Sequence, residues 1–263
     1  MPGLFITSSP ICMEQHDEML KAVIVDVDGT LYDLAPVRRR MRWRLACFAL
    51  SRPLTGWKTI RALSAFRSAQ ERLRVEGASA LLQVAMAAER SGYTEDFIQG
   101  CVTRWMEEEP LSAVPRARFK GVPEFFEWAK KRDLKIGVVS DYDPRKKLRV
   151  LRLDRYVHVS VWAQESEVGA FKPDPLGLRV AARRLGISPA EAIYVGDRWD
   201  VDAAAAHAAS MPCILLNPER PGQLASEAGS WYEIRHLLNK LIDSSGANPA
   251  RSLTVGPEVS LRP

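Results

Sequence analysis

The chain has 263 residues, of which 46% are hydrophobic and 26% are charged, and its formal net charge is +5. These values are ordinary for a globular protein that is long enough to bury a full core. No apolar run approaches the roughly 20 residues that a membrane span requires. Residues 1–20 lack the basic and long apolar regions of a secretory signal, so we expect them to form a flexible extension of a cytoplasmic protein.

The cysteines and histidines form no pattern that indicates a metal or nucleophile site. The cysteines are scattered without a CxxC pair, which argues against a zinc site or a disulfide framework and fits a reducing compartment. They are Cys12, Cys47, Cys101 and Cys213. The four histidines lie near no obvious nucleophile in the sequence, so we expect none of them to be catalytic.

The basic residues are concentrated in one segment. Between Val37 and Val75 there are eleven arginines or lysines against one acid, Glu71, so this segment carries +10 and the rest of the chain −5. We favour a solvated helix face as the explanation. The alternative is that some of these side chains recognise a second anionic group on a substrate or bind an acidic partner. The basic residues are Arg38, Arg39, Arg40, Arg42, Arg44, Arg52, Lys58, Arg61, Arg67, Arg72 and Arg74.

The first predicted element is a short strand at residues 22–25. Its sequence AVIV is rich in β-branching and does not alternate with polar residues, which is typical of a strand buried on both faces of a parallel sheet. From residue 34 to about 109 the apolar spacing becomes helical, with breaks at 52–56, at Gly77 and at 91–94. This pattern predicts an all-helical insertion of four helices of roughly 14 to 20 residues each. The prolines expected in its linkers are Pro36, Pro110 and Pro115, and the tryptophans expected in its core are Trp43, Trp57 and Trp105.

Strands and helices alternate after Gly121. The expected strands are 134–139, 157–163, 192–195 and 213–216, and the expected helices are 122–132, 144–153, 175–185, 201–209 and 231–242. Such alternation predicts an α/β fold with a doubly wound parallel sheet. We therefore expect a sheet domain made of residues 21–33 and 116–242, and a helical cap at 34–115. Residues 243–263 are rich in Ser, Gly, Asn and Pro, and we expect a disordered tail there.

Polar side chains fall at or just after the predicted strand ends. Asp26 and Asp28 follow the first strand, Ser140 ends the second, Lys172 lies in the loop after the third, and Asp197 follows the fourth. Because the carboxyl ends of parallel strands meet at one edge of a sheet, we expect these side chains to converge there. Buried carboxylates are costly without a compensating cation. A hard divalent ion, most simply Mg²⁺, suits oxygen ligands of this kind.

Four motifs carry a family resemblance. DVDGT at Asp26, VVS ending in Ser140, GAFKPDP around Lys172 and GDRWDVD from Gly196 closely resemble the four motifs of the haloacid dehalogenase-like (HAD) hydrolase superfamily. The resemblance covers about residues 21–218 and implies a Rossmann-like core. The helical insertion between the first two motifs resembles the C1-type cap of that superfamily.

The resemblance also implies roles for the residues at the strand ends. Asp26 would be the nucleophile that forms an aspartyl phosphate. Mg²⁺ would bind the Asp26 carboxylate, the Asp28 backbone carbonyl and Asp197. Lys172 and Ser140 would contact the phosphoryl oxygens. The Asp28 side chain would act as general acid and then as general base.

Asp28 also distinguishes between branches of the family. The dehalogenase branch expels halide, needs no proton and lacks an acid at the position of Asp28, so Asp28 favours phosphate chemistry.

Three further acids lie near these motifs. Asp202 or Asp200 would orient a metal-bound water, and the sequence does not decide between them. Asp141 stands where many relatives carry a neutral donor. We expect its side chain to turn away and cap the helix that begins at Pro144, or the affinity for phosphate to be modest.

We expect a Mg²⁺-dependent phosphatase that acts on a small phosphorylated metabolite. A phosphomutase or phosphotransferase would use the same site, with a sugar in place of water as the acceptor. A catalytically silent binding or regulatory protein on this scaffold is a further alternative, with the basic cap as its docking surface. Asp26, Asp28, Lys172 and Asp197 are all present, which argues against the silent protein. We expect no nucleic-acid partner, and the sequence leaves the substrate and the oligomeric state open.

Overall fold

The computed structural model describes residues 19–216 and 226–246. The expected N-terminal extension lies outside this part of the chain except for residues 19 and 20, and the expected tail lies outside it beyond residue 246. For residues 243–246 the expectation of disorder is wrong, because helix α10 (Trp231–Gly246) continues through them. Its N-terminal part is anchored by buried side chains such as Trp231 and Ile234. Each further residue of an established helix adds a backbone hydrogen bond without a new nucleation cost.

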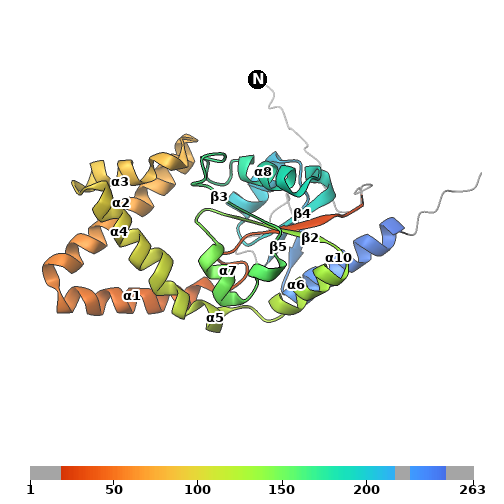
Figure 1. Ribbon diagram of the computed structural model, residues 1–263, viewed down its shortest axis with the longest axis horizontal. Coiled ribbons are helices and arrows are strands. Elements are labelled where there is room, and N and C mark those ends of the chain that lie inside the picture. The colour runs from red at the N-terminus through yellow and green to blue at the C-terminus, as the bar shows by residue number, and fades with distance from the viewer. Residues whose placement is uncertain (1–18, 217–225, 247–263) are drawn as a thin grey trace, which may run out of the picture.

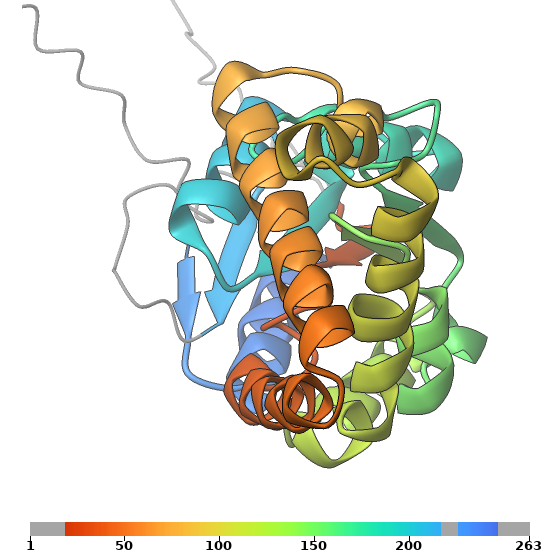
Figure 2. The ribbon, with the colours of Figure 1, turned by 90° about the vertical axis from the view of Figure 1, so that its left-hand side faces the viewer.

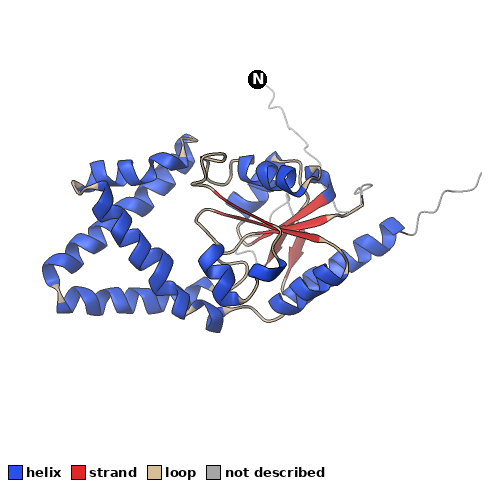
Figure 3. Ribbon diagram, viewed as in Figure 1, coloured by secondary structure: helices blue, strands red, loops and turns tan. Residues whose placement is uncertain are grey.

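The centre of the fold is a six-stranded parallel sheet in the order β3-β2-β1-β4-β5-β6 (Figures 1 and 3). Strand β1 (Ala22–Val25) lies in the middle, between β2 (Lys135–Ser140) and β4 (Ala192–Gly196). The outer strands are β3 (Val159–Trp162), β5 (Cys213–Leu216) and β6 (Ser226–Ala228). The predicted doubly wound parallel sheet is thus confirmed. The edge strand β6 has no predicted counterpart, because its three residues contain no apolar run.

Helices cover both faces of the sheet (Figure 1). Val23 and Val25 pack in the core formed with α10 and with helices α6 (Val122–Lys131) and α7 (Arg145–Leu151). Ala22 and Ile24 pack in a second core with α8 (Leu176–Leu185) and α9 (Ala204–Ala208). Successive side chains of a strand point to opposite faces, so the non-alternating AVIV run fits this double coverage. None of the described helices is long and apolar enough to cross a membrane.

An all-helical insertion between β1 and β2 forms one end of the molecule (Figures 1 and 2). A separate hydrophobic core, which includes Phe66, Ile98 and Trp105, holds its helices together. The helices are α1 (Leu34–Ser51), α2 (Pro53–Glu76), α3 (Gln83–Ser91), α4 (Glu95–Val102) and α5 (Val114–Ala117), with a π-helical segment at Thr103–Glu108 between α4 and α5.

The insertion departs from the predicted pattern at its prolines and at one glycine. The predicted break at 52–56 shrinks to Arg52, because Pro53 occupies the first turn of α2, where a missing N–H costs nothing. Gly56 does not interrupt the helix but allows close packing, since a Cβ atom there would lie 2.3 Å from Ala49 Cα. Pro36 lies in the first turn of α1 and is not part of a linker. Helices α3 and α4 are shorter than predicted, with 9 and 8 residues.

Two of the three tryptophans expected in the core of the insertion lie at its surface. Trp105 is buried, but Trp43 is 69% exposed and Trp57 is 67% exposed. Helix α1 turns Met41 and Phe48 toward the core of the insertion, and Trp43 lies on the opposite side of the helix because of its spacing from them. The prediction for Trp43 and Trp57 is therefore wrong.

The chain enters and leaves the insertion through two adjacent segments. The Asp33 N–H donates to the Ala117 carbonyl at 2.9 Å, and the Phe119 N–H donates to the Leu31 carbonyl at 3.1 Å. Between these hydrogen bonds, Tyr32 and Arg118 form an antiparallel bridge. The insertion is thus joined to the sheet by one paired connection.

Candidate active site

The register of the three central strands brings the expected site residues to one edge of the sheet. Val25 of β1 lies beside Val138 of β2 and Val195 of β4. Asp26 comes next, and its N–H donates to the Val195 carbonyl at 2.8 Å. Ser140 is the buried last residue of β2, and the structure describes no hydrogen bond from its hydroxyl. Asp197 directly follows β4.

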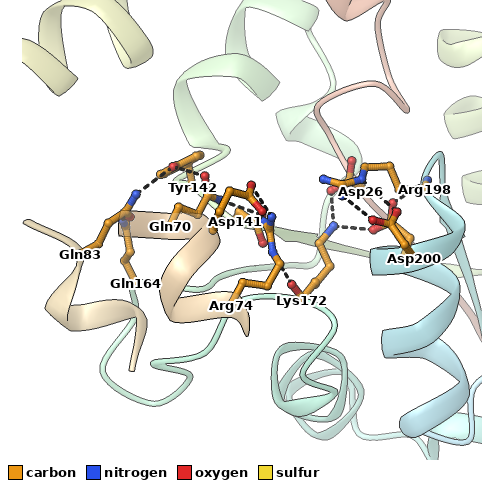
Figure 4. Close-up of polar contacts among 12 residues, drawn as sticks. Asp26, Gln70, Arg74, Gln83, Asp141, Tyr142, Gln164, Lys172, Arg198 and Asp200 are labelled. Carbon is orange, nitrogen blue, oxygen red and sulfur yellow. Dashed lines mark hydrogen bonds and ion pairs between the residues drawn. The ribbon is translucent and has the colours of Figure 1, made fainter. Parts of the chain in front are cut away.

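Lys172 reaches this edge from the loop between β3 and α8. Its Nζ donates to Asp26 Oδ1 at 2.6 Å, to Asp202 Oδ1 at 2.6 Å and to the Tyr194 hydroxyl at 3.0 Å. Burial alone would lower the pKa of Lys172, but the carboxylates of Asp202 and Asp26 outweigh it and hold this pKa well above its ordinary value. Lys172 therefore remains a cation between the two acids, and Figure 4 shows its contact with Asp26. Tyr194 is a site residue that the sequence analysis did not identify, because it is also a buried residue of a central strand.

The structure distinguishes the two acids that the sequence left open. Asp202 is buried, and its Oδ2 accepts hydrogen bonds from the backbone N–H groups of Asp197 at 3.2 Å and Arg198 at 3.0 Å. Asp200 instead pairs with the Arg198 guanidinium at 2.7 Å on the surface (Figure 4). Burial would raise the pKa of Asp202, but Lys172 and these hydrogen bonds hold it below its ordinary value. Asp202 belongs to the buried cluster and Asp200 does not.

The acidic cluster has the charge and the free oxygens that a divalent cation requires. One carboxylate oxygen from each of Asp26, Asp197 and Asp202 lies within 4.8 Å of the others. Three carboxylates against the single ammonium of Lys172 leave two negative charges uncompensated. Burial raises the pKa of Asp26 well above its ordinary value, and burial together with repulsion by Asp202 raises that of Asp197 to about 7. A bound cation would reverse both shifts.

Within this cluster the oxygens are not equally available. Both oxygens of Asp202 already accept two hydrogen bonds from protein donors. Asp26 and Asp197 retain unused lone pairs, so they are the better candidates for direct metal ligands. Asp202 would then contact the metal site indirectly, by positioning Lys172 and the Asp197 backbone through hydrogen bonds.

The turn after β1 closes tightly around Asp197. Gly29 has φ +97°, and a Cβ atom there would lie 2.2 Å from Asp197 Oδ2, so only glycine fits this position. The hydroxyl of Thr30 donates to Asp26 Oδ2 at 3.2 Å. The Thr30 carbonyl in turn accepts a hydrogen bond from Trp231 Nε1 at 3.0 Å. The sequence analysis had assigned no such contacts to Thr30 and Trp231, whose partners are distant in the sequence.

Asp28 lies apart from the Lys172 cluster and has a cationic partner of its own. Lys147 of α7 donates to both carboxylate oxygens of Asp28, at 2.7 and 2.6 Å, and the Tyr32 hydroxyl donates to one of them. Burial would raise the pKa of Asp28, but Lys147 outweighs it and holds this pKa below the ordinary value. Lys147 was not predicted because it lies in the basic run RKKL. One feature of the sequence could have identified it. Lys147 lies four residues before Leu151, which is buried, so both side chains lie on the same face of α7.

The Asp141 side chain contacts the insertion and does not cap the following helix. Its Oδ2 accepts hydrogen bonds from Arg74 Nη2 at 2.6 Å and from Gln70 Nε2 at 3.0 Å, both on α2 (Figure 4). The residue that caps the start of α7 is Asp143, whose Oδ1 accepts the Arg145 N–H at 2.9 Å. The expectation that Asp141 is the cap is therefore wrong. The insertion supplies a cation that compensates its charge.

Further polar contacts join the insertion to the sheet. Arg74 Nε donates to the Lys172 carbonyl at 2.8 Å. The Tyr142 hydroxyl donates to Gln70 Oε1 at 2.7 Å and accepts from Gln83 Nε2 at 3.1 Å. Gln164, in the loop after β3, donates to Gln83 Oε1 at 2.7 Å (Figure 4). Side chains of the insertion thus contact the loop that follows Ser140 and the loop that carries Lys172.

The chain thus combines a parallel α/β sheet with a cluster of carboxylates at the carboxyl ends of its central strands. A model of the haloacid dehalogenase-like hydrolases matches residues 20–210. Because this match spans most of the chain, the protein belongs to that family.

The relatives of the chain include phosphatases and a dehalogenase. The glyceraldehyde 3-phosphate phosphatase of Methanopyrus kandleri is 29% identical over 204 residues, which cover 75% of this chain and 84% of that protein. Phosphoglycolate phosphatase 1 of Pseudomonas aeruginosa is 28% identical over 218 residues, covering 79% and 74%. Among solved structures, a 2-haloacid dehalogenase from Pseudomonas syringae pv. Tomato is 25% identical with a TM-score of 0.60, covering 84% of this chain and 99% of that one.

The pairing of Arg74 with Asp141 gives a first prediction. Arg74→Met should raise KM for a phosphorylated substrate about fivefold, roughly 1 kcal/mol, because the Asp141 carboxylate loses its counter-charge beside Ser140. Adding Asp141→Asn should restore KM. Steady-state kinetics of both variants test this, with Arg72→Met as a matched control because Arg72 pairs with Glu76 at the surface. If Asp141→Asn does not restore KM, charge compensation is not the role of Arg74.

Proposed function

We propose that this protein is a Mg²⁺-dependent phosphatase that hydrolyses a small phosphorylated metabolite through an aspartyl phosphate. The observation that carries the proposal is the cluster of the buried Asp26 and Lys172 with the partly buried Asp197, and Asp28 held nearby by Lys147. The phosphatase names of the two curated relatives, whose substrates have two or three carbons, support a small phosphate ester as the substrate.

The groups at the sheet edge suit an in-line attack by a carboxylate. Asp26 would attack phosphorus, so that a bond from its oxygen to phosphorus forms while the bond from phosphorus to the leaving oxygen breaks. Lys172 lies 2.6 Å from Asp26 Oδ1, and it would offset the repulsion between the carboxylate and the phosphate. Asp26, Asp197 and the Asp28 carbonyl would hold Mg²⁺, which supplies positive charge to the phosphoryl oxygens when bound. The Ser140 hydroxyl would donate to one of those oxygens.

Asp28 is the proposed proton carrier. It would give a proton to the leaving oxygen in the first half-reaction and take one from the attacking water in the second. Its ion pair with Lys147 favours the carboxylate, which suits the second half-reaction directly. The first half-reaction requires that Asp28 be protonated and that this ion pair open. A halide leaving group would need no such proton, so Asp28 supports phosphate chemistry over dehalogenation.

The insertion would act as the cap of this site. We propose residues 34–115 as the cap domain, and residues 21–33 with 116–242 as the core domain. The contacts from Arg74 and Gln70 to Asp141 support this division, because they place α2 beside the loop that follows Ser140.

We also propose a cytoplasmic location. Cys47, Cys101 and Cys213 are free thiols in the described part of the chain, which fits a reducing compartment.

Replacing the nucleophile tests the mechanism directly. Asp26→Asn should lower kcat more than about a thousandfold, because an amide cannot form the acyl phosphate. The fold should survive, since Asn Oδ1 can still accept the Lys172 hydrogen bond. Phosphate release and thermal melting measure both effects, with Asp96→Asn on the exposed first turn of α4 as the control. Near-normal turnover in Asp26→Asn would refute the proposal.

Asp28 can be tested by varying the leaving group. Asp28→Asn should lower kcat about a hundredfold or more with an alkyl phosphate, whose leaving oxygen needs a proton. With para-nitrophenyl phosphate the loss should be at least about tenfold smaller, because that phenolate leaves unprotonated. Equal losses for the two substrates would exclude the general-acid role.

Metal binding can be measured apart from turnover. A hundredfold excess of Mg²⁺ over its Kd should stabilise the protein by about 2.7 kcal/mol, which raises Tm by roughly 5 to 10 °C for a chain of this size. Asp197→Asn should lose most of this shift, whereas Asp200→Asn should retain it because Asp200 lies outside the cluster. The same Mg²⁺-induced shift in all three proteins would rule out Asp197 as a ligand.

A further inference from the structure

The outer side of α1 is apolar although it faces away from the core of the insertion. Trp43 and Leu50 are 69% and 82% exposed, and Cys47 between them is also exposed. Their spacing of four and three residues places them on one face of the helix. Met41 and Phe48 occupy the other side and pack in the core. Helix α1 therefore has an apolar surface on both sides, and only one of them is covered.

Two further large apolar side chains are exposed in the first two turns of α2. Leu54 is 84% exposed and Trp57 is 67% exposed. Only Arg52 separates α1 from α2, and Gly56 packs closely on Ala49, so the start of α2 lies directly on the end of α1. We define the outer cap face as Trp43, Cys47, Leu50, Leu54 and Trp57. In Figure 2, which views the molecule from the end of the insertion, α1 and α2 lie at the front.

The outer cap face is surrounded by cations without nearby acids. No aspartate or glutamate occurs from Leu34 to Gln70. Within the described residues no ion pair involves the exposed basic side chains next to the apolar ones, unlike Arg44, which pairs with Glu109 at 2.8 Å. These unpaired cations are Arg39, Arg40, Arg42, Arg52 and Lys58. Uncompensated positive charge of this density attracts an anionic surface.

We propose that the outer cap face binds peripherally to the surface of a membrane that contains anionic lipids. Tryptophan and leucine side chains that project from a charged helix insert into the boundary between head groups and acyl chains. Arginine and lysine around them bind the anionic head groups. The face lies where α1 meets α2.

The composition of the face favours a lipid surface over other occupants. A nucleic acid would use the cations and the tryptophan rings, but the exposed leucines would have no role. A second copy of the chain would bring the same positive charges together. The proposal leaves the site at the sheet edge free, because the hydrogen bonds of Asp26, Asp28 and Lys172 involve no residue of the outer cap face.

Vesicle co-sedimentation of the full chain tests the proposal. Vesicles of phosphatidylcholine with about 30% phosphatidylglycerol should pull down the protein, and pure phosphatidylcholine vesicles should not. Binding should weaken at least about tenfold in 0.5 M salt, because screening removes the electrostatic part. Trp43→Ser with Trp57→Ser, and separately Arg39→Glu with Arg42→Glu, should each weaken binding about tenfold or more.

Matched controls lie at the other end of the molecule. Tyr232→Ser removes an exposed aromatic residue of α10, and Lys130→Glu with Lys131→Glu reverses two exposed charges of α6. Both controls should bind vesicles like the wild type. All variants should keep the wild-type Tm and the wild-type hydrolysis of para-nitrophenyl phosphate, because no altered residue contacts the site.

Three outcomes would overturn the proposal. The first is no binding to anionic vesicles at low salt, or equal binding by the outer-face variants and the wild type. The second is binding to RNA or polyglutamate, lost in the same variants, without vesicle binding, which would assign the face to an anionic polymer. The third is a dimer in solution that Trp43→Ser with Trp57→Ser dissociates, which would assign the face to a second copy.

Discussion

The ammonium group of Lys172 holds together the acidic side chains at the carboxyl ends of strands β1 and β4. It is buried and contacts Asp26, Asp202 and Tyr194. A buried ion is tolerated only when charge and hydrogen bonds compensate for lost hydration. Here one lysine serves the acids that follow two neighbouring strands, β1 and β4. Without it, both carboxylates would be buried without a counter-charge, so the stability of this edge depends on these contacts.

The sheet and its acids could be predicted because both follow from short local patterns, such as the AVIV run and the aspartate that ends it. Lys147 and Tyr194 could not be predicted as site residues. In the sequence, Lys147 looks like part of a basic surface helix, and Tyr194 looks like an ordinary residue of a buried strand. The conformation of the turn after β4 decides that Asp202 points inward and Asp200 outward. That turn is a π-helix (Trp199–Ala203), and the sequence does not determine which of the two acids an irregular helix directs inward.

The junction between the insertion and the sheet combines polar and apolar contacts. Glutamine amides, a tyrosine hydroxyl and the Arg74–Asp141 pair make its hydrogen bonds, and Leu73 of α2 packs with Phe171 in a small hydrophobic cluster. The other oxygen of Asp141 is buried without a hydrogen-bond partner, which costs about 1–3 kcal/mol. Polar contacts of this kind exchange for water at little net cost. The sequence indicated the insertion but not this junction, whose partners come from segments far apart in the chain.

The paired connection to the insertion has a mechanical consequence for Asp28. Tyr32 belongs to this connection through its bridge to Arg118, and its hydroxyl also bonds to Asp28. A rigid-body rotation of the insertion about the paired segments would therefore pull on the phenol of Tyr32. The Tyr32 side chain therefore links Asp28 to the segments that connect the sheet with the insertion.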